Sequence, residues 1–348
     1  MSMPIDREDL QHVLEHTRGL WEELRGSRVF ITGGTGFFGC WLLETFAFAN
    51  DQLGLGAQMV CLTRDAAAFA RKAPHLAAHA GIRLLHGDVR HFNFPPGEFS
   101  HVVHAGTTSA AHVAPLEEFD TIVSGTRRAL DFAVVSGAQK FLFTSSGSVY
   151  GKQPSDVTHM AETYLGGPDP CNPRAAYDEA KRAAELLCSV YHGEHGVKTK
   201  VARCFTFVGP HLPLDAHFAI GNFIHDGLHG KTITIRGDGT PRRSYLYAAD
   251  LMIWLWTILV RGRACYPYNV GSEDDLSISE LAHLVAGCFA PVPAVRIETP
   301  LTVGKAADRH VPATGRARAE LGLVQRIDLT AAIGKTIAWS AREIRPQP

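Results

Sequence analysis

A short apolar strand that ends in three closely spaced glycines constrains this 348-residue chain more than any other feature. The segment Arg28–Thr32 runs into glycines at positions 33, 36 and 39, and a helical apolar pattern begins at Cys40. Such glycines permit a tight turn, close approach of the backbone to a pyrophosphate, and close packing of helix on strand, while free N–H groups face the anion. The sequence therefore predicts a dinucleotide-binding turn. Its contact residues are Gly33, Thr35, Gly36, Phe37, Phe38 and Gly39.

Short apolar segments alternate with longer helical patterns over the first two thirds of the chain. This alternation predicts an α/β fold, a doubly wound parallel (Rossmann) sheet with helices on both faces. The expected strands are Arg28–Thr32, Gln58–Thr63, Ile82–His86, His101–Ala105, Lys140–Thr144 and Lys198–Cys204.

The chain divides into three expected parts. Residues 1–26 form an N-terminal helical extension, with apolar positions at helical spacing, and residues 27–205 form the dinucleotide-binding domain. Residues 206–348 form a smaller α/β region that binds substrate, part of which packs back on the sheet. Helices are expected there near 216–229, 250–261 and 277–289.

Composition excludes several classes of protein. The formal net charge of −1 gives no field that attracts nucleic acid or an anionic membrane, and the longest apolar run is far too short to span a bilayer. The seven cysteines are scattered and show no C-x-x-C spacing. We therefore expect a cytoplasmic protein without disulfides or a metal centre. The histidine pairs His101 with His104 and His225 with His229 do not change this, since the first pair lies on a strand and the second lacks the glutamate of a zinc motif.

The end of the second strand bears on the choice of dinucleotide. NAD sites usually place an acidic residue there to bond the ribose 2′-hydroxyl, but this chain has Thr63 followed by Arg64. A guanidinium at this place can pair with a 2′-phosphate, which favours NADP(H). Arg64 can also be a surface residue that stacks on adenine, so both cofactors, NAD and NADP, stay open.

Two further segments carry hydroxyl and amine groups suited to hydride chemistry. The run Thr144-Ser145-Ser146-Gly147-Ser148-Val149-Tyr150-Gly151 is followed by Tyr177-Asp178-Glu179-Ala180-Lys181. These segments resemble the serine segment and the Y-x-x-x-K motif of the extended short-chain dehydrogenase/reductases, in the nucleotide-sugar epimerase and dehydratase branch. The resemblance implies that Ser146, Tyr177 and Lys181 are catalytic. Asn172-Pro173 starts a helix on which Tyr177 and Lys181 lie one turn apart, so that an ammonium group favours the phenolate as base.

The resemblance extends to other cofactor and substrate contacts. It implies that Asp88, Val89, His104, Ala105 and Gly106 line the cofactor, although Gly106 departs from the family's usual alanine. It also implies a nucleotide-diphosphate sugar as substrate and a homodimer as the assembly. The segment 171–250 looks most similar to UDP-glucuronate decarboxylases. The implied substrate contacts are Thr107, Ser148, Thr206, Asn222, Arg243 and Arg309, of which Thr206 replaces an asparagine common in relatives.

The residues after Ser146 bear on the reaction. Dehydratases of this branch carry an Asp-Glu pair at this place and decarboxylases keep the Glu, whereas this chain has Gly147 and Ser148. Without a carboxylate there, elimination lacks its acid and base. The sequence therefore favours a 4-epimerase, for which NAD is the expected cofactor. The alternatives are a 4-ketosugar reductase, a dehydratase or decarboxylase served by Glu162 or Asp178, and a non-catalytic dinucleotide-binding protein.

Overall fold

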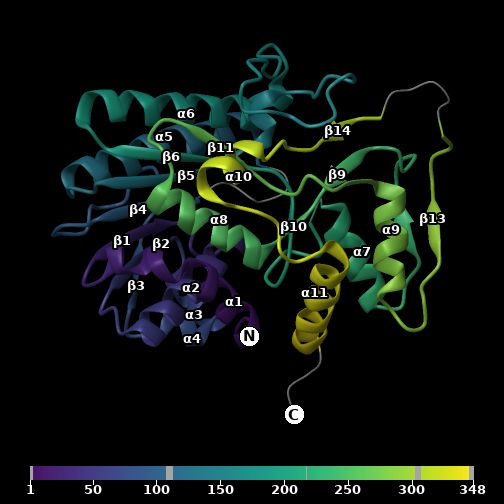
Figure 1. Cartoon of the computed structure of the whole chain (residues 1–348), viewed down its shortest axis with the longest axis horizontal. Helices are drawn as coiled ribbons and strands as arrows, with labels where there is room; N and C mark the ends of the chain where they lie inside the picture. The colour runs from purple at the N-terminus through teal and green to yellow at the C-terminus, as the bar shows by residue number, and fades with distance from the viewer. Residues whose placement is uncertain (1–2, 107–112, 217, 302–306, 345–348) are drawn as a thin grey trace.

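A seven-stranded parallel sheet forms the centre of the computed structural model, which describes residues 3–106, 113–216, 218–301 and 307–344. The strands lie in the order β11-β6-β5-β4-β1-β2-β3 (Figure 1). From β1 the chain first adds β2 and β3 on one side and then adds β4 and the later strands on the other side, as in a doubly wound sheet. The predicted fold class is confirmed. The strands are β1 Arg28–Thr32, β2 Gln58–Thr63, β3 Ile82–His86, β4 His101–His104, β5 Lys140–Ser146, β6 Lys198–Cys204 and β11 Pro267–Val270.

Helices cover both faces of this sheet because the central strands are apolar on both sides. On β1, Val29 and Ile31 join the core under α2 (Phe37–Leu53) and α8 (Ala248–Arg261), while Phe30 points to the other face. That opposite core lies under α5 (Pro115–Val135) and α6 (Ala176–His195). Two short helices, α3 (Ala66–Lys72) and α4 (Pro74–Ala77), connect β2 to β3.

The N-terminal extension packs against the body of the molecule. It consists of α1 (Arg7–Thr17) and a 3-10 helix (Arg18–Leu24), whose buried Val13, Leu14 and Trp21 belong to the core shared with α2 and α8. The buried Asp9 carboxylate accepts a 2.6 Å hydrogen bond from the Tyr247 hydroxyl and lies 3.0 Å from Lys335 on α11 (Leu329–Ile344). The extension therefore ties the sheet domain to the C-terminal helix.

The C-terminal part contributes small sheets and additional helices. A three-stranded sheet has the order β12-β9-β14, and two parallel pairs join β10 to β7 and β13 to β8. From the same part of the chain, β11 joins the main sheet beside β6 and α8 covers it. None of the described helices is long and apolar enough to cross a membrane. The remaining elements are α7 Ala219–Leu228, α9 Ile278–Gly287, α10 Gly315–Leu321, β7 Phe207–Val208, β8 Ile233–Ile235, β9 Arg242–Ser244, β10 Leu246–Tyr247, β12 Asp275–Ser277, β13 Val295–Ile297 and β14 Arg309–His310.

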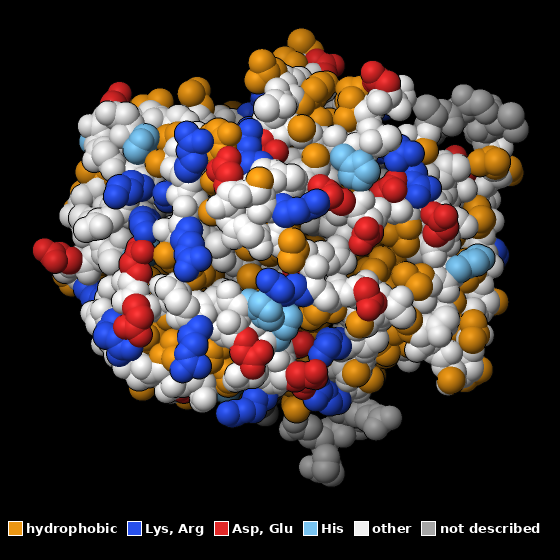
Figure 2. Space-filling view, viewed as in Figure 1, with side chains coloured by type: hydrophobic (Ala, Val, Ile, Leu, Met, Phe, Trp, Pro, Cys, Tyr) orange, Lys and Arg blue, Asp and Glu red, His pale blue; other side chains and the backbone are white. Residues whose placement is uncertain are grey.

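Basic and acidic side chains are interspersed on the surface drawn in Figure 2. This distribution agrees with the formal net charge of −1 for the whole chain. An anionic ligand must therefore be held by local groups, because an overall field of either sign is lacking.

Candidate active site

The glycine turn after β1 has the geometry of a phosphate-binding cradle. Gly33 has φ of +71°, and a side chain there would place its Cβ 2.5 Å from the Ala105 carbonyl oxygen. A Cβ on Gly39 would overlap the Gly33 carbonyl oxygen, so the start of α2 packs directly on the turn. Gly36 is exposed, and a Cβ there would make only ordinary contacts within the protein. The absence of a side chain at Gly36 therefore leaves the backbone open to a ligand. These residues fit a dinucleotide pyrophosphate.

The other cofactor residues expected at the turn lie around it. Phe38 packs edge-on against Phe207, with ring centroids 5.1 Å apart, and Phe37 packs against Phe38. The Lys72 ammonium donates a 2.9 Å hydrogen bond to the Thr35 carbonyl oxygen. The aromatic pair and the lysine therefore support the turn from two sides.

His104 joins the ends of β1 and β4. Its ring nitrogens lie 2.7 Å from the Thr32 hydroxyl and 3.0 Å from the Thr126 hydroxyl, and the Gly106 N–H also donates to Thr32. Burial lowers the pKa of His104 to about 3, so the imidazole is neutral. His104 thus acts on the site by holding the strand ends in place, and Ala105 packs against Gly33.

The remaining cofactor residues lie at the ends of β2 and β3. Thr63 is buried and Arg64 is exposed. The Asp88 carboxylate lies 3.0 Å from Arg90, and this guanidinium holds the pKa of the aspartate below its usual range. Val89 packs against Gly125 of α5, where a Cβ would meet it at 2.8 Å.

Ser146, Tyr177 and Lys181 meet where β5 ends beside α6. The Asn172 side chain accepts a 3.1 Å hydrogen bond from the Arg174 N–H and starts the 3-10 turn Pro173–Ala175 that leads into α6. Lys181 is 2% exposed, donates a 2.8 Å hydrogen bond to the Thr144 carbonyl oxygen, and lies 5.7 Å from the Tyr177 ring centroid. The structure therefore brings the three predicted catalytic residues together.

Hydrogen bonding orients the Ser146 hydroxyl. Its Oγ accepts a 3.1 Å hydrogen bond from the Ser148 N–H, so the hydroxyl proton is free to be donated. Burial raises the pKa of Tyr177 to about 12, and hydrogen bonding with Ser146 opposes this rise. Burial also lowers the pKa of Lys181 to about 8. In the protein alone, the phenol is therefore protonated at neutral pH.

A buried network that the sequence reasoning missed supports this centre. Glu185, one turn after Lys181 on α6, accepts a 2.5 Å hydrogen bond from the Ser145 hydroxyl and lies 2.6 Å from Arg203. The Arg203 guanidinium lies over the Tyr150 ring, 4.7 Å from its centroid. The sequence does show that Glu185 follows Lys181 by four residues, which puts both on one face of a helix. It does not show that Ser145 on β5 and Arg203 on β6 are the partners of Glu185.

Gly147 follows Ser146 at the position discussed in the sequence analysis for an acid. A Cβ at Gly147 would lie 2.8 Å from three ring carbons of Phe205. The Phe205 ring therefore fills the space that a side chain at this position would need, and the ring would have to shift to admit one. The next residue, Ser148, is a predicted substrate contact whose buried hydroxyl lies near the Asp178 carboxyl group.

The two carboxylates proposed as substitutes differ in their surroundings. Glu162 accepts a 2.9 Å hydrogen bond from the Asn269 N–H and lies 3.9 Å from Arg316, with 5% of its side chain exposed. Glu162 therefore joins its own loop to strand β11 and helix α10. Asp178 follows Tyr177 on α6, and burial raises its pKa although the nearby Ser148 hydroxyl acts in the opposite direction. Of the two, Asp178 is the carboxyl group near the catalytic residues.

The predicted substrate arginines lie on opposite faces of the small sheet. Arg242 pairs with Arg309, and Arg243 pairs with His310, in the parallel register of β9 and β14. Because side chains alternate along a strand, Arg243 and His310 share one face and Arg309 points to the other. Arg243 lies 2.8 Å from Asp308, whereas Arg309 lies 2.7 Å from Asp275.

Contacts identify which face of the small sheet points to the catalytic residues. The His310 ring lies 4.6 Å from the Phe205 ring, and Phe205 packs on Gly147. The face with Arg243 and His310 is therefore the one toward Ser146, and Arg309 is placed away from it. His310 and Phe205 are site residues that the sequence reasoning missed, since only the folded chain brings β14 to Gly147.

Other predicted substrate residues lie in varied surroundings. The Thr206 hydroxyl donates to the Ser244 carbonyl oxygen and thereby links the end of β6 to β9. Asn222 is half-buried in the first turns of α7. Thr107 lies outside the described residues.

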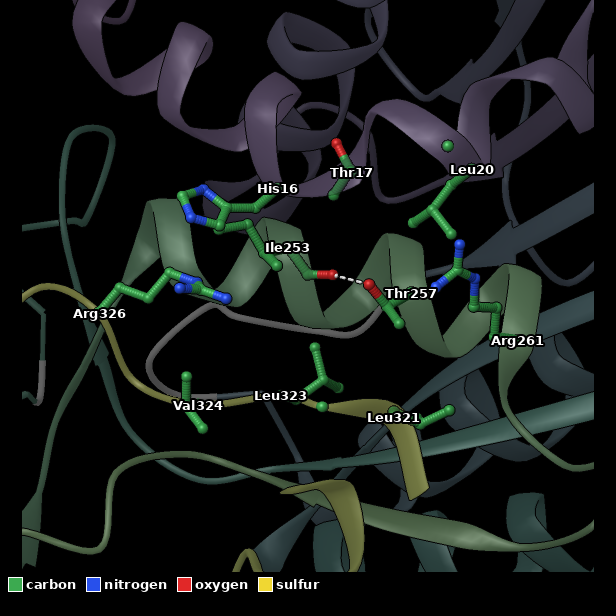
Figure 3. Close-up of a pocket in the computed structure, with 12 residues that line it drawn as sticks. His16, Thr17, Leu20, Ile253, Thr257, Arg261, Leu321, Leu323, Val324 and Arg326 are labelled. Atoms are coloured by element: carbon green, nitrogen blue, oxygen red, sulfur yellow. Dashed lines mark hydrogen bonds between the residues drawn. The ribbon is translucent and has the colours of Figure 1, made fainter. Parts of the chain in front are cut away.

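A separate cavity of about 80 Å³ lies between the N-terminal extension, α8 and the loop after α10 (Figure 3). His16, Arg261 and Arg326 are among its lining residues. The end of α8 near this cavity contacts the first residue of β5, since Lys140 donates a 2.8 Å hydrogen bond to the Val260 carbonyl oxygen. The cavity therefore lies toward the amino ends of the strands, whereas Ser146 ends β5 at the opposite edge.

Comparisons with known proteins identify relatives of this chain. UDP-glucuronic acid decarboxylase 1 of Danio rerio is 28% identical over 325 residues, which cover 92% of this chain and 74% of that protein. The homologous enzyme of Arabidopsis thaliana is 28% identical over 313 residues, covering 89% and 69%.

Solved structures show the same fold. A UDP-glucose 4-epimerase from Thermotoga maritima aligns with a TM-score of 0.74 and 19% identity, covering 91% of this chain and 100% of that one. A dTDP-glucose 4,6-dehydratase from Streptomyces venezuelae, with NAD bound, gives 0.73 and 24%, covering 91% and 98%. The profile of the NAD dependent epimerase/dehydratase family matches residues 29–271, well over half of the chain. The chain is therefore an enzyme of the NAD dependent epimerase/dehydratase family.

Proposed function

We propose that this enzyme interconverts nucleotide-diphosphate sugars that differ at the C4 hydroxyl, as a 4-epimerase. The observation that carries the proposal is that the Phe205 ring packs against Gly147, so the chain presents no acid at the position where elimination requires one. Oxidation at C4 followed by reduction from the other face needs only one phenol and a hydride carrier. The site offers Tyr177 for this purpose, with Ser146 and Lys181 beside it.

Different residues of the site bind the cofactor, transfer the proton and position the C4 oxygen. Gly33, Gly36 and Gly39 would hold the pyrophosphate of the dinucleotide, whose nicotinamide, when bound, supplies the hydride acceptor and donor. Tyr177 takes the proton of the C4 hydroxyl and returns it to the C4 oxygen after the ketosugar has rotated in the site. Ser146 donates its hydroxyl proton to the C4 oxygen and keeps it near the phenol. Burial raises the pKa of Tyr177 to about 12 even though the hydrogen bond with Ser146 opposes the rise, so positive charge from Lys181 and the oxidised cofactor must favour the phenolate.

The epimerase proposal is tested with a panel of substrates in D₂O. Purified enzyme is incubated with UDP-glucose, UDP-N-acetylglucosamine, UDP-glucuronate and dTDP-glucose, and products are followed by NMR. We expect the C4 epimer of at least one sugar, with no deuterium at C5. Formation of a 4-keto-6-deoxy sugar carrying deuterium at C5, or absence of every C4 epimer, would contradict the proposal.

UDP-glucuronate decarboxylation is a second candidate, favoured by the relatives that align over most of the chain. Oxidation of glucuronate at C4 gives a β-keto acid, which loses CO₂ without a base because the C4 carbonyl accepts the electron pair. Protonation at C5 and return of the hydride to the C4 carbonyl then complete the reaction, and Asp178, whose pKa is raised by burial, is a suitable proton donor. In the same panel, release of CO₂ and a UDP-pentose from UDP-glucuronate would establish this reaction. An Asp178→Asn variant should then form pentose at least 10-fold more slowly, by the usual scale of acid catalysis.

We also propose a homodimer formed through α5 and α6. These neighbouring helices expose apolar side chains: Leu116 and Phe119 on α5 are 81% and 37% exposed, and Leu186 and Val190 on α6 are 65% and 40% exposed. Apolar surface gathered on adjacent helices is typical of an association site. Light scattering should show a dimer for the wild type and a monomer for Leu186→Glu with Val190→Glu. Val292→Glu, changed at an exposed apolar residue elsewhere, should remain dimeric.

A cytoplasmic location is proposed as well. All seven cysteines are free thiols in the structure, and four of them are buried in the main sheet and its flanking helices, as in reduced proteins. Cell fractionation with an antibody against the native chain tests this, and recovery in the periplasmic or membrane fraction would contradict it.

A further inference from the structure

The edge of the sheet where β1 and β2 end has a composition unusual for an NAD site. The two strands are parallel with Thr32 opposite Leu62, so the glycine turn and the Thr63-Arg64 segment lie at the same edge. In dinucleotide-binding sheets the adenosine ribose lies over this edge, and its 2′ position faces the residue that ends the second strand. The groups at this place therefore decide between a hydroxyl and a phosphate.

The carboxylates near this edge are already engaged. Thr63 stands where an acidic residue would bond the 2′-hydroxyl. Asp65 accepts a 2.7 Å hydrogen bond from the Ala68 N–H and caps α3. Asp88 lies 3.0 Å from Arg90, which also pairs with Glu117 and Asp120. Among residues 3–106 as described, the β2 terminus thus lacks an uncommitted acid for the ribose.

Two cations flank the same edge. Arg64 is exposed and forms no hydrogen bond or ion pair with the described part of the chain. Lys72, at the other end of the short helix α3, reaches back so that its ammonium lies 2.9 Å from the carbonyl oxygen of Thr35 in the glycine turn. Arg64 thus lies at the end of β2, and the Lys72 ammonium lies at the glycine turn that follows β1. The ribose of a bound dinucleotide is expected between these two places.

We propose that the enzyme binds the 2′-phosphorylated dinucleotide, NADP(H), with Arg64 and Lys72 as its two specificity-determining residues. A guanidinium fork and an ammonium group suit a phosphate dianion, which a carboxylate would repel. The inference rests on the proposed function only in placing the dinucleotide on the glycine turn, and it holds whichever C4 reaction follows. Lys72 adds to Arg64 a determinant that the sequence pattern did not indicate.

Binding of cofactor fragments tests this proposal without turnover. Calorimetry compares adenosine 2′,5′-bisphosphate with adenosine 5′-monophosphate on the wild-type enzyme freed of nucleotide. We expect the bisphosphate to bind at least 10-fold more tightly, and each of Arg64→Met and Lys72→Met to reduce that preference about 5-fold or more, as for one charge-assisted hydrogen bond. Arg71→Met, at an exposed arginine beside Lys72, is the matched control and should keep the full preference.

The possible outcomes separate this inference from the proposed function. Equal affinity of the two nucleotides, or a preference unchanged in both variants with native unfolding temperatures, overturns the NADP(H) assignment and leaves the C4 chemistry intact. Failure of both nucleotides to bind overturns the inference and the proposed function together, because the glycine turn would then not hold adenosine. Mass analysis of nucleotide released from denatured enzyme gives an independent check, and retained NAD in stoichiometric amount would contradict the inference.

Discussion

The catalytic edge of the main sheet and the small C-terminal sheet are built in contrasting ways. At the catalytic edge, Lys181 is 2% exposed and its ammonium is held by the Thr144 carbonyl oxygen. In the small sheet, Arg243 and Arg309 are each 25% exposed and are paired with Asp308 and Asp275. In the first region the cation is buried and held by the backbone, whereas the second consists of partly exposed ion pairs.

This difference indicates how each region contributes to activity. Groups fixed in a buried site need no rearrangement when the reaction occurs, and this is the source of electrostatic preorganisation. An arginine paired with a carboxylate must exchange that partner for a substrate diphosphate, so part of its binding energy is lost in the exchange. Substitutions at the catalytic edge should therefore change kcat, and those in the small sheet should change KM.

The largest effect is expected for Tyr177→Phe. Removal of the Tyr177 phenol should lower kcat about 1,000-fold, within the range of general acid–base catalysis, while KM changes little. The ring and its packing are retained, so the unfolding temperature should stay within a few degrees of the wild-type value. Steady-state kinetics with calorimetric melting checks both; a variant with half of the wild-type kcat would show that Tyr177 is not the base.

Lys181→Met tests the cost of a buried ammonium. Burial lowers the pKa of Lys181 from 10.5 to about 8, and a shift of this size corresponds to about 3 kcal/mol against the folded state below pH 8. The inactive variant should therefore be more stable than the wild type at pH 7, by up to about 3 kcal/mol less the lost hydrogen bond to Thr144. Between pH 8 and 10.5 the native lysine loses its proton, so this advantage should shrink. Urea unfolding at pH 7 and 9.5 measures the difference in unfolding free energy between the variant and the wild type. A difference that grows with pH would contradict a lowered pKa for Lys181.

Arg243→Met and Arg309→Met test the two faces of the small sheet. Loss of a charge-assisted hydrogen bond to a diphosphate costs about 1.5–3 kcal/mol, so Arg243→Met should raise KM roughly 10- to 100-fold. Arg309 points to the other face, and its replacement should change KM less than about 3-fold, as for a surface ion pair. Kinetics on the matched pair decide this point. A larger KM effect at position 309 would mean that the small sheet moves when substrate binds.

The smallest effect is expected for Asp308→Ala. Removal of the carboxylate frees Arg243 for the substrate, so KM should fall by up to about 5-fold, the range of an exposed ion pair. The gain should weaken at high salt, because screening already loosens the pair in the wild type. Kinetics at low and high salt measure it, with Asp275→Ala, which frees Arg309 instead, as the control expected to leave KM unchanged.

Local sequence determined much of the main sheet. Strand Arg28–Thr32, the glycine turn and the helix that follows were predictable because periodicity, glycine conformation and helix start act within a few residues. Tyr177 and Lys181 were predictable for the same reason, since their spacing on one helix fixes their separation.

Tertiary structure alone decided the substrate side. The sequence placed Arg243 and Arg309 together, but strand pairing between β9 and β14 set them on opposite faces, and register depends on partners distant in the chain. The same holds for Phe205 against Gly147 and for His310 against Phe205. Local patterns thus determined the glycine turn and the spacing of Tyr177 and Lys181. Long-range packing decided which other side chains face them, because contacts between distant segments depend on the whole fold rather than on spacing along the chain.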